Sequence, residues 1–90
     1  MTPPTIACAV ALRDGGIDAM AALDDALREA IAGVSAEHAD ELKLAFGRVM
    51  AEVSDTLINP AVRAYPQLNP DEPTWIAVAK ARAGARFNAP

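Results

Sequence analysis

The residues best suited to chemistry in this 90-residue chain are one histidine, one cysteine and a set of arginines. His38 and Glu41 are three residues apart, the spacing found in part of the carboxylate–histidine metal site of helical bundles. That site also needs an inward-facing glutamate on another helix, and Glu41 falls on the charged side of its own helix. We therefore expect His38 to be half-buried or to cap a helix, and we predict no metal and no cofactor.

Nucleophilic catalysis has little support in the sequence. Cys8 lies in an apolar run, where a thiol is usually buried and unreactive. Ser35 and Ser54 have no plausible arrangement of histidine and acid around them, and no glycine-containing elbow. Gly15-Gly16 lacks the spacing and the preceding strand of a phosphate-binding loop, so we predict that it ends a helix. These observations favour a protein that is not an enzyme.

One enzymatic alternative depends on arginines. A site between two subunits could hold an anionic substrate if at least two arginine side chains converged on one pocket. The candidates for this role are Arg13, Arg28, Arg48 and Arg63.

A nucleic-acid regulator is a further alternative, based on the basic residues near the C-terminus, Lys80, Arg82 and Arg86. With Trp75 and Phe87 they resemble a surface of basic and stacking groups. The same cations are typical of a helix C-terminus, where the helix dipole favours them, and we do not expect nucleic acid as a partner.

Composition favours helices. Twenty-one residues are alanine and only four are aromatic, so the core must be mainly aliphatic. The net charge of −4 divides unevenly: residues 1–59 carry four basic and ten acidic side chains, and residues 60–90 carry four basic and two acidic. This division indicates attraction between the two parts, or between two subunits. No apolar stretch of membrane-spanning length and no basic leader is present, so we expect a soluble cytoplasmic protein.

The hydrophobic period predicts an all-α bundle of three to four helices, in one domain of residues 1–90. Its centre is an antiparallel hairpin of two helices, Ile17–Val34 and Ala36–Ile58. Gly33 is expected to end the first helix, and Ser35 is expected to be the N-cap of the second. The first helix has its apolar stripe at Ile17, Met20, Leu23, Leu27, Ile31 and Val34. The second has its stripe at Ala39, Leu42, Phe46, Val49, Met50, Val53 and Leu57.

The flanking segments are harder to assign. Residues 5–12 fit either a short helix or a strand, and we prefer a helix that stops at Asp14-Gly15-Gly16, leaving residues 1–14 as an N-terminal arm. Asn59-Pro60 predicts a break or kink. A proline-rich connector over 66–73 precedes a short C-terminal helix from about Thr74 to Gly84, and residues 87–90 are expected to fray.

A second apolar stripe on the back of the Ala36–Ile58 helix is the best functional clue. It consists of Leu44, Gly47, Ala51 and Ile58, and Trp75 is a further candidate because tryptophan is favoured at interfaces. A helix with apolar residues on two faces needs two packing partners. We therefore expect a non-enzymatic protein–protein interaction module or small subunit. Its partner would be a second copy of the chain, in a homodimer, or another protein chain.

Overall fold

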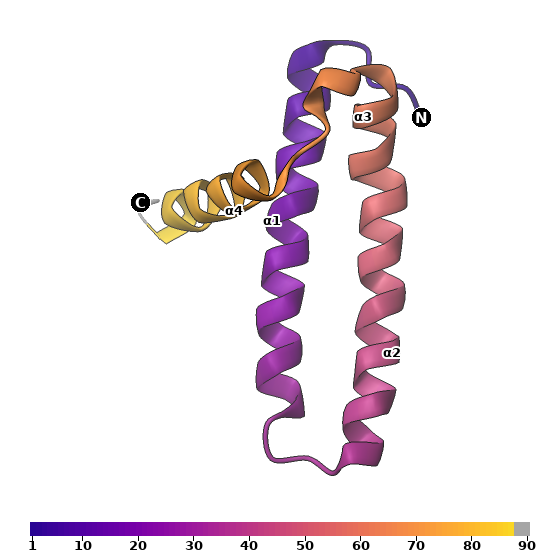
Figure 1. The fold of residues 1–90 in the computed structure, drawn as a ribbon, viewed down its shortest axis with the longest axis vertical. Coiled ribbons are helices and arrows are strands. Elements are labelled where there is room, and N and C mark those ends of the chain that lie inside the picture. The colour runs from indigo at the N-terminus through magenta and orange to yellow at the C-terminus, as the bar shows by residue number, and fades with distance from the viewer. Residues whose placement is uncertain (88–90) are drawn as a thin grey trace.

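The computed structural model of the chain describes residues 1–87 and is all-α, as the sequence predicts. Helix α1 spans Ile6–Ile31 and α2 spans Ala36–Val53, and the two form an antiparallel hairpin (Figure 1). A π-helical turn, η1, covers Ser54–Ile58 and leads into α3, Asn59–Ala64. A 3₁₀ turn, η2 (Pro66–Leu68), then precedes α4, Glu72–Phe87.

Helix α1 runs through the two glycines that were expected to end it. Thr5 caps its start, where the Thr5 hydroxyl accepts a hydrogen bond from the Cys8 N–H at 3.1 Å. The prediction of a helix stop at Asp14-Gly15-Gly16 is therefore wrong, and so is the strand alternative for residues 5–12. Each glycine costs about 1 kcal/mol relative to alanine in a helix, and the packing of Gly16 described below offsets this cost.

The connection between α1 and α2 has the predicted signals. Gly33 adopts a φ of 80°, a left-handed conformation that glycine accepts without strain and that commonly follows a helix end. Ser35 is the N-cap of α2, and its hydroxyl accepts a hydrogen bond from the His38 N–H at 3.2 Å. The hairpin is therefore closed by local chemistry that can be recognised in the sequence.

Just before Asn59-Pro60, where a break or kink is predicted, the chain forms a π-helical turn. The Asn59 N–H donates to the Ser54 carbonyl, five residues back, and the chain continues as a helix to Ala64. Proline has no N–H and its ring crowds the carbonyl four residues earlier. A wider turn just before Pro60 relieves this conflict and lets the helix continue, at the cost of one extra residue in that turn.

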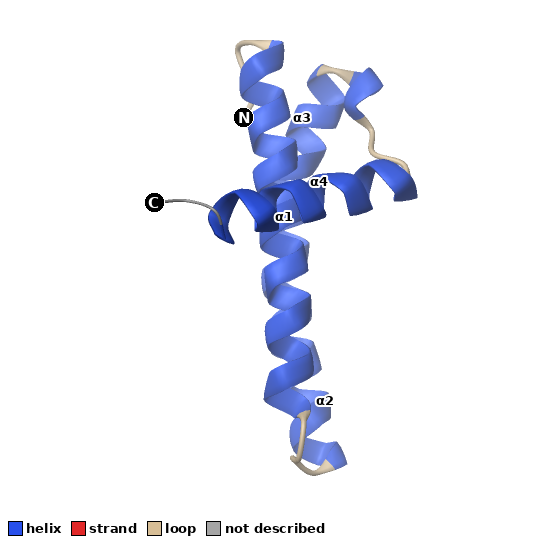
Figure 2. Ribbon diagram, turned by 90° about the vertical axis from the view of Figure 1, so that its left-hand side faces the viewer, coloured by secondary structure: helices blue, strands red, loops and turns tan. Residues whose placement is uncertain are grey.

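Helix α4 packs against α1 on the side away from α2 (Figure 1). The view turned by 90° shows that α4 runs across α1 (Figure 2). Asp71 starts it, since the Asp71 carboxylate accepts a hydrogen bond from the Thr74 N–H at 2.8 Å. The helix is longer than the predicted Thr74–Gly84 and reaches Phe87, which belongs to the predicted frayed tail. The rest of that tail, 88–90, lies outside the described residues.

The buried core lies at one end of the hairpin, where the start of α1 meets α3 and η2. Ala9 and Ala61 are fully buried there with Leu68 at 8% exposure, and Ile17 is also fully buried. The remainder of the hairpin has no such core, because no residue of the segment 18–57 is buried. Helices α1 and α2 pack along each other, but most side chains of the two predicted stripes are only half-buried.

Candidate interaction surface

The predicted back stripe of the second helix is only partly formed. Leu44 is 64% exposed, and Gly47 and Ala51 are also exposed, so these three residues share a free surface. Ile58 does not belong to it, because its exposure is only 5% and it packs against Gly16 of α1. The expected placement of Ile58 is wrong for a definite reason: one residue added in η1 rotates the later part of the helix by about 100°.

Trp75 lies on α4, in the first turns after the Asp71 cap. It is half-buried and lines a hollow of about 480 Å³ between α4 and the hairpin, together with Met20 of α1 and Met50 of α2. The hollow is bordered by charged side chains, among them Arg28 and Lys80. Trp75 thus anchors α4 over the hairpin, and its role at an interface with another chain stays a prediction.

A second hollow, of about 460 Å³, runs along α2 and η1 and has an almost wholly apolar floor. Val49, Val53 and Leu57 form this floor, with Val49 51% exposed. Arg48 and Glu52 form its edge, and the Thr56 hydroxyl donates to the Glu52 carboxylate at 3.0 Å. The sequence does not predict this groove, because it assigns Val49 and Val53 to the main apolar stripe of the second helix, which was expected to pack against the first.

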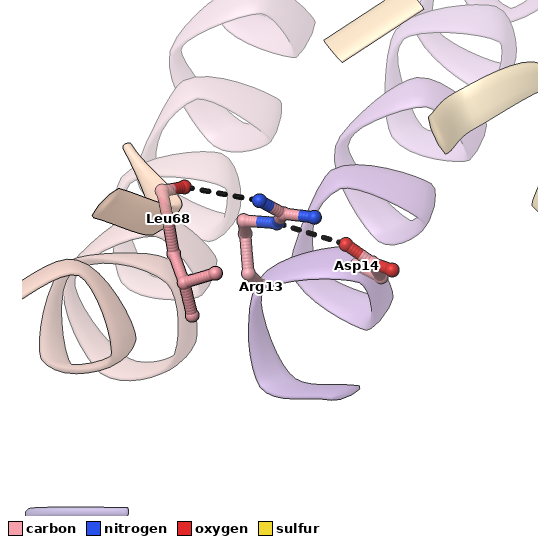
Figure 3. A network of polar contacts seen from close by, with 3 residues as sticks. All are labelled: Arg13, Asp14 and Leu68. Atoms are coloured by element: carbon pink, nitrogen blue, oxygen red, sulfur yellow. Dashed lines mark hydrogen bonds and ion pairs between the residues drawn. The ribbon is translucent and has the colours of Figure 1, made fainter. Parts of the chain in front are cut away.

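The four arginines of the enzymatic alternative are scattered. Arg13 serves the fold: its Nη1 donates to the Leu68 carbonyl at 3.2 Å and its Nε to the Asp14 carboxylate at 2.9 Å (Figure 3). Its side chain is only 14% exposed, so it ties α1 to η2. Arg28 pairs with Asp24 and Asp25 on its own helix.

The other two arginines lie apart from these. Arg48 edges the apolar groove and makes no ion pair within residues 1–87, and Arg63 is exposed on α3. A third hollow, between α1 and α4, contains Arg82 instead. None of the three hollows described here contains more than one of the four arginines.

The basic residues of α4 are also divided among different surroundings. Arg86 forms an ion pair with Asp18 of α1, which holds the last turns of α4 against the hairpin. Arg82 lines the third hollow near Asp14, whereas Lys80 borders the hollow that contains Trp75. Attraction between the acidic first part of the chain and its basic last part, one of the two predicted explanations of the charge division, is therefore seen within one molecule.

His38 and Cys8 have structural surroundings. His38 is exposed rather than half-buried, and its Nδ1 lies 3.2 Å from the hydroxyl of Ser35, the cap of the same helix. Cys8 is half-buried on the first turn of α1. Residues 1–87 contain no cluster of three or more histidine, cysteine or acidic side chains that could hold a metal ion.

Within residues 1–87, no helix combines the length and the apolar character needed to cross a membrane. Comparison with protein-family models, curated proteins and solved structures gives no match to this chain.

Proposed function

We propose that this chain is a non-enzymatic interaction module that works as a homodimer. The observation that carries the proposal is the absence of any buried residue in the segment 18–57, which includes the whole of α2. A helical hairpin is stabilised mainly by burying its apolar faces, and this hairpin buries its stripes only halfway. A partner that covers the hairpin would complete its core.

The overall dimensions support the same proposal. The chain exposes 5952 Å², whereas a compact monomer of 9.4 kDa exposes about 5,000 Å². Its radius of gyration is 14.8 Å, against about 12 Å for a compact domain of this length. A chain of this size has a small core of its own, and dimerisation is a common way to enlarge it.

Thermal unfolding at several protein concentrations tests the proposal. If only the dimer is folded and stable, its unfolding midpoint rises with protein concentration, because association stabilises the native state by mass action. We expect a clear rise over a range of about 100-fold in concentration, with reversible transitions. A midpoint that stays constant over this range would show a self-sufficient monomer and refute the proposal.

A further inference from the structure

We propose that a second copy of this chain covers the hairpin face, a set of apolar residues on α1 and α2 that lies outside the hollow beneath α4. The face consists of Ala19, Leu23 and Ala26 of α1 and Leu42, Val49 and Val53 of α2. This inference rests on the proposed homodimer and specifies the surface that forms it. It differs from the surface of Leu44, Gly47 and Ala51 that the hydrophobic pattern indicates.

Helix geometry places the hairpin face away from the hollow beneath α4. Met50 lines the hollow beneath α4, and Val49 lies about 100° further around the helix, in the separate groove on α2. On α1, Arg28 lines the hollow beneath α4, and Ala19 lies about 180° from it around the helix axis. Val49 and Ala19 therefore both lie away from the hollow beneath α4, which Met50 and Arg28 line.

The excess of exposed area over a compact monomer is of the size that a stable dimer buries. The chain exposes about 950 Å² more than a compact monomer of its mass, and each partner in a standard interface buries about 800 Å². The groove of about 460 Å³ lies on this face and offers space for side chains of a second hairpin. Two hairpins packed face to face would form a four-helix bundle, in which the half-buried stripes become core.

The hairpin face also fits a second helix pair better than the Leu44 surface does. It extends over two helices, and the small side chains of Ala19 and Ala26 leave room for the aliphatic side chains of a partner. The Leu44 surface lies on one helix, and Asp40 falls between Leu44 and Gly47 around the axis. Covering that surface would bring a carboxylate out of water, which is unfavourable unless it is paired.

The charges along the edge of the groove define how the copies are aligned. The helical run from Ala36 to Ala64 has residue 50 at its midpoint, and Arg48 and Glu52 lie symmetrically about it. A two-fold axis at this level makes α2 antiparallel to the α2 of the second copy and overlaps the hairpins along most of their length. Each Arg48, which has no ion-pair partner within residues 1–87, then faces Glu52 of the other copy.

One pair of substitutions tests the face. Val49→Glu would bury an unpaired charge in the dimer and should weaken dimerisation at least about 100-fold in sedimentation equilibrium. Leu44→Glu adds the same charge to the same helix outside the hairpin face and should leave the dissociation constant within about threefold of the wild type. Circular dichroism controls for helix content. Dimerisation that survives Val49→Glu, or that is lost with Leu44→Glu, overturns the face while leaving the homodimer intact, whereas a monomeric wild type overturns both proposals.

A mixing experiment tests the alignment, and it remains informative even if Val49→Glu fails to fold. Arg48→Glu and Glu52→Arg should each weaken the homodimer about tenfold, because every cross-chain pair then brings like charges together. Mixed in equal amounts, the two variants should form a heterodimer in preference to either homodimer, since each contact again joins opposite charges. Native mass spectrometry measures the proportions. A statistical mixture of the three species would overturn the alignment.

Discussion

Gly16 of α1 lies directly against Ile58 of η1, so close that a Cβ atom on Gly16 would be 2.6 Å from Ile58 Cγ1. Its neighbour Gly15 has nothing within 4 Å of the same position. Two adjacent glycines thus have different roles. Gly16 permits the close approach of the two helical segments near the buried end of the hairpin, whereas Gly15 meets no such contact.

This difference predicts opposite effects of the same substitution. Gly16→Ala should lower the free energy of unfolding by about 1–3 kcal/mol, because Ile58 must move to make room. Gly15→Ala should raise it by up to about 1 kcal/mol, because alanine is the better helix former. Urea denaturation at equal protein concentration measures both, and equal stability of the two variants would contradict the packing described for Gly16.

Arg13 should contribute to the free energy of unfolding, because its side chain ties α1 to η2. Arg13→Gln removes the charge and weakens the bonds to the Asp14 carboxylate and the Leu68 carbonyl, at a cost of about 1.5–3 kcal/mol in the free energy of unfolding. Arg63→Gln is the matched control on an exposed arginine, and it should change that free energy by less than about 0.5 kcal/mol. Equal loss in both variants, measured by urea denaturation, would show that Arg13 does not tie α1 to η2.

Asp71 should make the start of α4 sensitive to acid. Hydrogen bonds from the Thr74 side chain and then from its backbone N–H lower the pKa of Asp71 below its ordinary value. A group with a lowered pKa in the folded state stabilises that state at higher pH, and the contribution is lost as the pH falls below about 4 through the folded pKa.

An NMR titration of the Asp71 carboxyl group measures this pKa directly. Thr74→Ala removes the hydroxyl but keeps the N–H, so the pKa of Asp71 should move part of the way back to its ordinary value. An unchanged pKa in the variant would contradict the role given to the Thr74 side chain.

Local sequence patterns predict the helical hairpin well, but they fail at Gly16 and Ile58. The period of the apolar residues, Gly33 and Ser35 identify α2 and the loop before it, because these signals act within a few residues. Gly16 was misassigned as a helix end because its role, to allow the close approach of Ile58, depends on a contact distant in the sequence. The phase of Ile58 was misassigned because Pro60 is accommodated by a wider turn instead of a break, and the period of a regular helix does not include that extra residue.

The candidate surface shows the same limit. The sequence marks Leu44, Gly47 and Ala51 as exposed and apolar, and they are. It assigns Val49 to the inner stripe, because hydrophobic period does not reveal that α4 packs against α1 and leaves this residue uncovered. Only the arrangement of all three long helices distinguishes an inner side chain from one at the open edge.

Sedimentation equilibrium of the wild-type chain tests whether it forms a homodimer. We expect a species of twice the 9.4 kDa chain mass, in reversible equilibrium with the monomer at low concentration. A single species of 9.4 kDa at high protein concentration would contradict it, because the half-buried hairpin would then be stable without any partner.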